Sequence, residues 1–408
     1  MIHLPVLKVK DREFQLPVDA PTEDYHDALN ELEKDGEIIV QRAPENSMEV
    51  KTKYGRTKLI PIDKTWHHKS CGQCGHIPGY STSIFWLNRA LGLDYIDPKD
   101  QTSCTAWNYY ASATSNPAAQ AAVAIRNFAA AHETGYFPII HCATSYGHYK
   151  EVRQSLIHHA ELRAQVRKIL ARLGKKLVIP EEIVHYSEWV YAMRHRIAER
   201  QVIDMSHITA TVHPACHYHK LIEEDAIYTP EIYGAQRTAI ITGVLQELGI
   251  NVGDYSSWFD CCGFGFRHIL VSRDFSRSFA VQRKIEVMIE EVNPDLTVTH
   301  DTGCVTTLDQ SQFAGKAHGK KVGLPVMADS QVAALAMGAH PYKVLQLHWH
   351  NTDNTKFLNK LGMDVDQKWQ EFETACSKLR DGSKQYLTWE DAESSDLVGK
   401  FARPKATV

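Results

Sequence analysis

Two adjacent cysteines, Cys261 and Cys262, are followed at once by the turn Gly263-Phe264-Gly265. A disulfide between neighbouring residues is strained, because adjacent sulfurs rarely reach the required geometry without distorting the peptide. Adjacent thiolates on a loop loosened by glycine are better suited to holding iron at two points. The alternative is that both side chains are small buried hydrophobic groups, as free cysteines often are. The other cysteines of the chain bear on this choice.

The composition limits the classes of protein to which this chain can belong. It has 408 residues, nine cysteines and a formal net charge of −4, a length sufficient for two or three domains. We expect no nucleic-acid partner, because there is no basic field, and no membrane span, because no run of about 18 apolar residues occurs. Residues 1–8 lack the apolar core of a signal peptide, so we expect a cytoplasmic protein. Since the cytoplasm keeps thiols reduced, the cysteines indicate metal binding, redox chemistry or core packing rather than disulfides.

The cysteines follow the same order in the two halves of the chain. The first half has Cys71, Cys104 and Cys142, and the second has Cys216, Cys261-Cys262 and Cys304. A helix ending in Leu-Gly precedes the middle position in each half, and a predicted strand precedes the last cysteine. Open α/β sheets build their sites at the carboxyl ends of strands. We therefore interpret the halves as an internal repeat that equates Cys71 with Cys216, Cys104 with Cys262 and Cys142 with Cys304.

Alternating strands and helices must position these cysteines. We expect strands at 58–62, 93–96, 137–140, 208–212 and 296–300, and helices at 22–35, 81–91, 117–132, 146–173, 181–199, 235–248 and 279–291, with another starting at 332. This alternation predicts an α/β fold with mainly parallel sheets. We expect two pseudo-symmetric α/β domains at 58–178 and 179–350. An N-terminal appendage at 1–57 would precede them, and a helical or extended C-terminal tail at 351–408 would follow.

Over roughly residues 58–350 the cysteine pattern resembles the CCG domain, which is duplicated in the B subunit of heterodisulfide reductase. That family has five cysteine ligands per domain: a leading cysteine, a Cys-Cys-Gly and a final Cys-x-x-Cys. In the second copy Cys216, Cys261, Cys262 and Cys304 match four positions, and Thr307 stands at the fifth. In the first copy Ser103-Cys104 replaces the pair and Cys142-Ala143-Thr144-Ser145 the final motif, so that three of the five positions are kept.

The resemblance implies iron–sulfur clusters held by the two cysteine sets. An additional thiol, Cys74, gives each half four cysteines: Cys71, Cys74, Cys104 and Cys142 in the first, and Cys216, Cys261, Cys262 and Cys304 in the second. Four thiolates are what a [4Fe-4S] cluster requires. We expect one or two [4Fe-4S] clusters, cubane or noncubane, and the intact Cys261-Cys262 makes the second set the better candidate for the disulfide chemistry. His219 and His268, which follow these cysteines, are candidates to protonate a leaving thiolate or are surface residues.

The resemblance also implies a function. It indicates an oxidoreductase subunit that acts on a thiol, disulfide or protein-bound persulfide and passes electrons one at a time to partner subunits. Similar proteins occur in the heterodisulfide-reductase-like complexes of sulfur-oxidising prokaryotes. The partners implied are a ferredoxin-like C subunit, a flavin-bearing A subunit and a lipoate-binding sulfur-carrier protein.

Two alternatives stay open. Cys71-x-x-Cys74 has zinc-ribbon spacing, and Cys104, Cys142 or His68 would complete a tetrahedral structural zinc site in the first half. Loss of the fifth cysteine in both copies fits a non-catalytic subunit that transfers electrons or docks a carrier while a related chain performs the chemistry.

Overall fold

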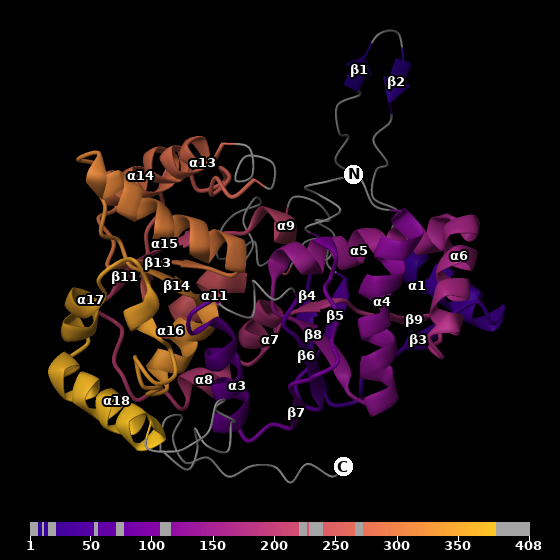
Figure 1. Ribbon diagram of the computed structural model, residues 1–408, viewed down its shortest axis with the longest axis horizontal. Helices are drawn as coiled ribbons and strands as arrows, with labels where there is room; N and C mark the ends of the chain where they lie inside the picture. The colour runs from indigo at the N-terminus through magenta and orange to yellow at the C-terminus, as the bar shows by residue number, and fades with distance from the viewer. Residues whose placement is uncertain are drawn as a thin grey trace.

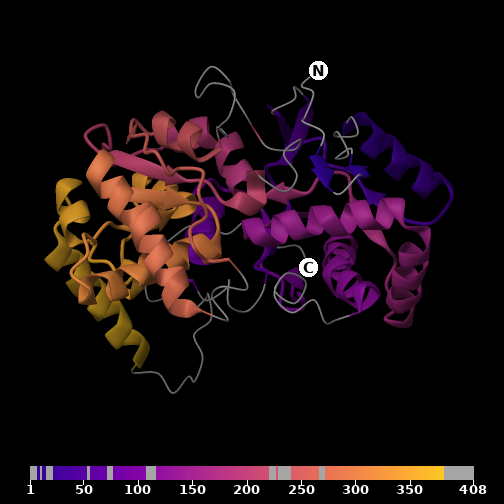
Figure 2. The ribbon, with the colours of Figure 1, turned by 90° about the horizontal axis from the view of Figure 1, so that it is seen from above.

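In a computed structural model, two lobes lie side by side, each around its own small parallel sheet (Figures 1 and 2). The structure describes residues 7–9, 12–14, 22–52, 56–70, 77–106, 116–219, 227, 240–265 and 272–380. Within this part of the chain, no helix combines the length and the apolar composition needed to cross a membrane.

The two sheets have the same strand order. The first contains β6 (Thr65–His68), β7 (Tyr95–Ile96), β8 (Phe137–Ile140) and β10 (Val184–His185), arranged β10-β8-β6-β7 with every pair parallel. The second contains β11 (Thr209–His213), β12 (Asn251–Val252), β13 (Leu296–Thr299) and β14 (Val326–Ala328), arranged β12-β11-β13-β14, also with every pair parallel. In both, the first strand along the chain lies between the second and the third. The predicted α/β fold with parallel sheets is confirmed.

Helices connect the strands of each sheet. Those of the first lobe are α3 (Tyr80–Ala90), α4 (Pro117–Thr134), α5 (Ala143–His158), α6 (Ala160–Arg172), α7 (Tyr186–Ala192) and α8 (Arg194–Ala198). Those of the second are α9 (Cys216–His219), α11 (Ile240–Glu247), α13 (Arg273–Ala280), α14 (Glu286–Glu291), α15 (Thr302–Ala317) and α16 (Asp329–Ala336). A π-helical segment, Val281–Ile285, joins α13 to α14.

The lobes are held together by helix contacts that cross between them. Helix α3 packs against α16 of the other lobe, and α7 packs against α11. Buried apolar side chains from both sheets, including Ile139 and Val298, belong to one connected hydrophobic core. Burial of apolar surface therefore stabilises the two lobes against each other as well as each lobe internally.

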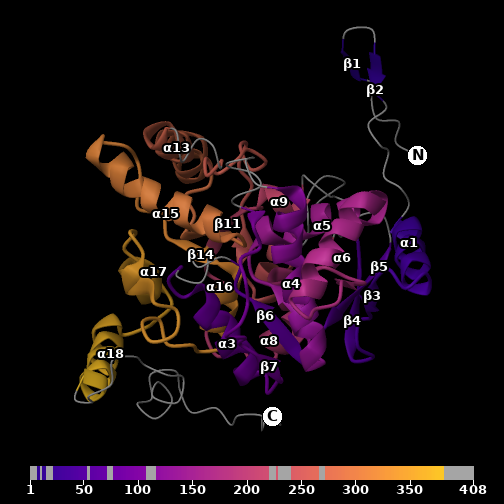
Figure 3. The ribbon, with the colours of Figure 1, turned by 45° about the vertical axis from the view of Figure 1, so that its right-hand side comes forward.

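The N-terminal segment is attached to the first lobe. After α1 (Thr22–Lys34), strand β3 (Ile39–Gln41) pairs in parallel with β9 (Val178–Pro180). Strands β4 (Ser47–Lys51) and β5 (Thr57–Pro61) form an antiparallel hairpin. A separate hairpin of β1 (Leu7–Val9) and β2 (Arg12–Phe14) lies away from the lobes (Figures 1 and 3). Strand β9 crosses the boundary expected between residues 178 and 179. Through the pairing of β3 with β9, the segment expected as an appendage at 1–57 is therefore joined to the junction between the two expected domains.

Several element predictions were wrong in detail. The strand expected at 58–62 is β5 of the hairpin, and the strand of the parallel sheet is β6, which was not predicted. The helix expected at 146–173 is interrupted at His159, whose backbone is extended at φ −116°. The residues expected to form one helix at 181–199 instead contain the short strand β10 followed by two separate helices, α7 and α8. The helix expected at 279–291 begins at Arg273 and contains the π-helical segment.

The C-terminal segment begins with regular helices. A 3₁₀ turn at Leu347–Trp349 is followed by α17 (Thr355–Lys360) and α18 (Val365–Arg380). The extended tail expected at 394–408 lies outside the described residues. The division into two domains and a tail stays a prediction.

Candidate cysteine site

Four cysteines of the second half meet at the carboxyl end of its sheet. Cys216 begins α9 shortly after β11, Cys304 lies in the first turn of α15 after β13, and Cys261-Cys262 follow β12. The Cys261 side chain interacts with those of Cys216 and Cys262, and the Cys262 sulfur lies within 4.8 Å of the Cys304 sulfur. These four residues, which we call the second thiol group, form one connected set of sulfurs.

The Cys-Cys-Gly turn is shaped to aim backbone donors at its own sulfurs. The N–H groups of Gly263 and Phe264 donate to the sulfurs of Cys261 and Cys262, each over 3.4 Å. Gly263 has a φ of +91°, and a Cβ there would lie 2.6 Å from the Ser276 carbonyl oxygen of α13. Glycine is therefore required both for the left-handed backbone and for the close approach of α13.

The four thiols share their protons unequally. The pKa of Cys261 is lowered, because the thiols of Cys216 and Cys262 and the Gly263 N–H donate to its sulfur and outweigh burial. The pKa of Cys216 is raised by its interaction with Cys261 and then by burial, and the pKa of Cys262 is raised by its interactions with Cys261 and Cys304 and then by burial. The Cys262 hydrogen bond lowers the pKa of Cys304, but burial and Asp301 outweigh it and raise that pKa to about 11.

A buried group of this kind suits a metal centre, because several thiolates in one apolar site repel each other unless a cation neutralises them. The donor set of four sulfurs with backbone N–H···S contacts fits an iron–sulfur cluster. The ligand atoms of His213, Cys262 and Cys304, all buried, also lie within 4.8 Å of one another. Three such donors fit a tetrahedral zinc ion equally well.

The described cysteines of the first half have different partners. Cys104 accepts a hydrogen bond from Ser145 Oγ over 3.0 Å. The Cys142 thiol donates to Asp301 Oδ1 of the second half over 3.3 Å. Cys71, Cys74 and His268 lie outside the described residues, as does the side chain of His219 in α9. Their roles as ligands or proton donors stay predictions.

The sheet register corrects one equivalence that the cysteine order had suggested. His68 and His213 each stand three residues before the leading cysteine of their half. His68 pairs with Ile140 and His213 pairs with Thr299, so Ile140 and Thr299 are equivalent.

Counting onward from these two residues, Cys142 is equivalent to Asp301, and Ser145 is equivalent to Cys304. Cys142 and Asp301 both occupy the N-cap position of the following helix, which supports the count independently. The prediction that Cys142 corresponds to Cys304 was therefore wrong. The contact of Ser145 with Cys104 in the first half parallels that of Cys304 with Cys262 in the second.

Equivalent residues from the two halves touch where the lobes meet. Cys142 contacts Asp301, and Tyr80 Oη lies 2.5 Å from the His141 carbonyl oxygen and 3.0 Å from that of His300. His141 and His300 directly precede Cys142 and Asp301. These contacts between equivalent residues indicate that a local two-fold axis relates the two halves and lies beside the second thiol group.

Asp301 joins the halves and was missed by the sequence analysis. Its Oδ2 caps α15 by accepting from Cys304 N over 3.1 Å, and its Oδ1 accepts from Thr144 N over 3.0 Å and from Cys142. Asp301 is 3% exposed. An aspartate directly after a strand and before a helix is a recognisable N-cap signal, which would have identified the capping role although not the contact with Cys142.

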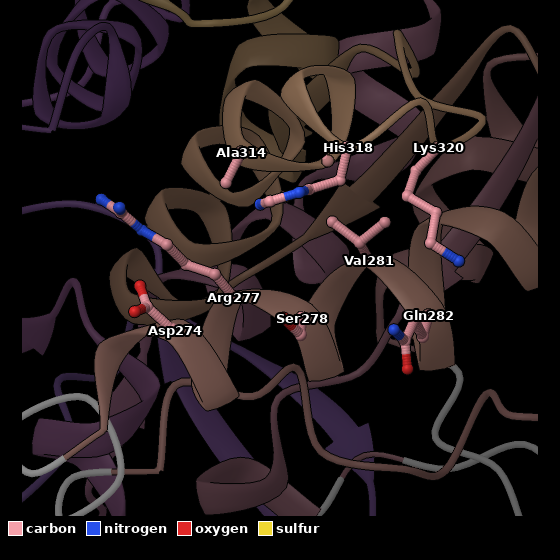
Figure 4. Close-up of a pocket in the computed structure, with 9 residues that line it drawn as sticks. Asp274, Arg277, Ser278, Val281, Gln282, Ala314, His318 and Lys320 are labelled. Carbon is pink, nitrogen blue, oxygen red and sulfur yellow. The ribbon is translucent and has the colours of Figure 1, made fainter.

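A pocket of about 230 Å³ lies between α13 and α15. Figure 4 shows Val281 and Arg277 on one side and His318 and Ala314 on the other. None of the described cysteines lines it. Helix α13 contacts the Cys-Cys-Gly turn through Ser276 and Ala280, which do not line the pocket. The pocket is therefore separate from the second thiol group.

Comparisons with known proteins agree with the cysteine pattern. The cysteine-rich (CCG) domain family matches residues 210–309, a span that contains the second thiol group. A protein of Archaeoglobus profundus that is like the heterodisulfide reductase B subunit is 29% identical over 271 residues, 65% of this chain and 88% of that protein. The B subunit of the ferredoxin:CoB-CoM heterodisulfide reductase of Methanosarcina acetivorans is 28% identical over 315 residues, 74% of this chain and 98% of that protein. The resemblance to the heterodisulfide reductase B subunit is confirmed.

A solved structure shows the same kind of fold at low sequence identity. The crystal structure of a hypothetical protein from Helicobacter pylori aligns with a TM-score of 0.56 and 15% identity. The alignment covers 84% of this chain and 59% of that protein. This similarity concerns the fold alone.

Proposed function

We propose that this chain, which is similar to the B subunit of heterodisulfide reductase, is a cytoplasmic iron–sulfur oxidoreductase subunit. Its substrate would be a thiol, a disulfide or a protein-bound persulfide of sulfur metabolism. The observation that carries the proposal is the second thiol group, in which the side chains of Cys216, Cys261, Cys262 and Cys304 interact with one another at the carboxyl end of the sheet.

In this proposal, the chain holds a [4Fe-4S] cluster through the four cysteine sulfurs, and the bound cluster supplies one-electron redox chemistry. The backbone N–H groups of Gly263 and Phe264 stabilise negative charge on two of the sulfurs. Phe264 lies against Gly303, where a Cβ would be 2.9 Å from its ring, and so reduces the access of water to the sulfurs. Cys216 and Cys261 are partly exposed whereas Cys262 and Cys304 are buried, so a substrate sulfur would approach the group at Cys216 or Cys261.

The partners are part of the same proposal. By similarity to the heterodisulfide reductase B subunit, the chain would act in a complex of the heterodisulfide-reductase-like kind, with a ferredoxin-like C subunit and a flavin-bearing A subunit. A lipoate-binding carrier protein would deliver sulfur to it, and His219 and His268 would protonate the leaving thiolate.

Metal analysis tests the proposal directly. The protein is purified without oxygen, iron, sulfide and zinc are counted per chain, and EPR spectra are recorded in oxidised and reduced states. We expect iron and acid-labile sulfide in the wild type. Cys262→Ser should lose most of the iron assigned to the second thiol group. Cys376→Ser, which alters a half-buried cysteine of α18, should keep all of it. Wild-type protein with zinc and no acid-labile sulfide would refute the redox function.

A zinc-stabilised structural subunit is the second candidate, because His213, Cys262 and Cys304 offer three converging ligands. Iron-free protein that binds one zinc per chain, and loses it in His213→Ala, would support this candidate. A cluster with an EPR signal that no thiol or disulfide perturbs would instead favour a subunit that only transfers electrons.

A further inference from the structure

Lys284 is a fully buried lysine beside the Cys-Cys-Gly loop. It lies in the π-helical segment Val281–Ile285, and π-helical turns inside α-helices are frequent at functional sites. Its Nζ donates to the carbonyl oxygens of Ser257 and of Trp258, the latter over 3.1 Å, and lies 4.8 Å from the centre of the Tyr255 ring. Lys284 therefore binds the backbone of the loop that leads into Cys261.

The neighbouring residues fix the same loop at further points. The side chain of Arg283 donates to Asp260, which directly precedes Cys261, and the Ser257 hydroxyl donates to the Arg283 carbonyl oxygen. Tyr255 in turn donates to the carbonyl oxygen of Val212 in β11, over 3.2 Å. The π-helical segment and the sheet thus hold the loop between them.

In the first half, an uncharged side chain at the matching place in the fold holds the loop that leads to Cys104. Asn127 lies in α4, the helix that leads into β8, as the π-helical segment and α14 lead into β13. Its amide accepts from Thr102 N over 2.8 Å and donates to Thr102 O over 3.1 Å, two residues before Cys104. A neutral amide is therefore sufficient to anchor such a loop in this fold.

A lysine is a costly residue at this buried position, since a buried charge needs compensation. Burial lowers the pKa of Lys284 to about 7, while Cys262, Asp260, Cys304 and Cys261 act in the opposite direction. Asp260 is paired with Arg283. The other groups that favour the charged form of Lys284 are cysteines of the second thiol group, which become thiolates when they bind a metal.

We propose that Lys284 is a positioning residue that holds the Cys-Cys-Gly loop and supplies a buried positive charge to the centre bound by the second thiol group. The inference rests on the proposed iron–sulfur function and assigns a determinant of its reduction potential. A nearby fixed cation stabilises the more negatively charged, reduced state, and so raises the potential of the bound centre.

The experiment compares three variants of the full chain. Lys284→Gln removes the charge but keeps an amide donor for the loop, and Lys284→Arg keeps the charge. Lys321→Gln is the matched control, because Lys321 is an exposed lysine paired with Glu290 over 3.1 Å. Each protein is reconstituted without oxygen, its iron and sulfide are counted, and the EPR-detected midpoint potential is measured by redox titration.

We expect Lys284→Gln to have a lower midpoint potential than the wild type, and Lys284→Arg and Lys321→Gln to match the wild type. If Lys284→Gln does not bind iron, its potential cannot be measured, and Lys284→Arg then tests whether the charge is needed. Iron content and midpoint potential like those of the wild type in Lys284→Arg would support the requirement for charge. Failure of both variants to bind iron overturns the electrostatic role in favour of one set by side-chain shape.

Two results separate this inference from the proposed function. A wild-type EPR signal whose midpoint is unchanged in Lys284→Gln overturns the role of Lys284 and leaves the iron–sulfur function standing. Wild-type protein that binds no iron–sulfur cluster overturns both.

Discussion

Replacing Asp301 by alanine should destabilise the junction between the two halves. The substitution removes the N-cap of α15, worth about 1 kcal/mol in other helices. It also removes the acceptor of the buried Thr144 N–H and the Cys142 thiol, and an unsatisfied buried donor costs about 1–3 kcal/mol. The cap and the two donors sum to about 3–7 kcal/mol, and we expect a loss in the lower part of this range, about 3–5 kcal/mol, because a thiol is a weak donor.

Urea unfolding of the metal-free, reduced protein, followed by tryptophan fluorescence, measures this loss. Asp301→Asn keeps one acceptor oxygen and should fall between the wild type and Asp301→Ala. The matched control is Asp353→Ala, in which an exposed aspartate loses its hydrogen bond from Thr355 N, 2.8 Å long. That control should cost less than about 1 kcal/mol, because solvent replaces an exposed partner. Equal losses in Asp301→Ala and Asp353→Ala would show that Asp301 does not join the halves.

Two further predictions concern buried titratable groups. Burial, with a smaller effect of Lys69, lowers the pKa of His67 to about 3. Below pH 6.5 the unfolded chain therefore binds a proton that the folded protein does not, and the free energy of unfolding falls by about 2 kcal/mol by pH 5. Urea unfolding at pH 7 and pH 5 measures this loss, and it should be smaller by about 2 kcal/mol in His67→Gln than in the wild type. His318→Gln, which changes an exposed histidine, should lose as much stability as the wild type. The same loss in all three proteins would contradict the reasoning. Burial raises the pKa of Asp329 to about 6, so its ionised form destabilises the fold above that pH, and Asp329→Asn should gain up to about 3 kcal/mol at pH 7 and almost nothing at pH 4; a gain in the thermal midpoint that is the same at both pH values would disprove this assignment.

The sequence predicted the α/β class and the second thiol group because both depend on local signals. The glycines after α3 and α11 mark helix ends, and apolar runs mark β8 and β13. Strands β6 and β10 were missed for a physical reason. Trp66-His67-His68 has a polar composition although its side chains are buried, and β10 has only two residues before a helix begins. Burial supplied by neighbouring strands overrides local composition there.

The position of Cys142 could not be read from the order of cysteines. Residue type aligns Cys142 with Cys304, whereas hydrogen-bond register aligns it with Asp301. Cys142 stands at the N-cap, directly after its strand, whereas Cys304 stands three residues further along, in the first turn of its helix. The two side chains therefore leave the backbone at different places and in different directions. The pairing of the strands fixes that register, and the pairing is a property of the assembled sheet.

The differences between the two halves bear on the role of Lys284. The half with Ser145 in the place of Cys304 anchors its loop through the neutral Asn127, and the half with four contacting thiols anchors its loop through the charged Lys284. In the second half the charge of Lys284 would be compensated by thiols that become thiolates when a metal is bound. The charge and the thiols therefore occur together in the second half, as an electrostatic pairing requires. Loop anchoring alone would have placed the same kind of residue in both halves.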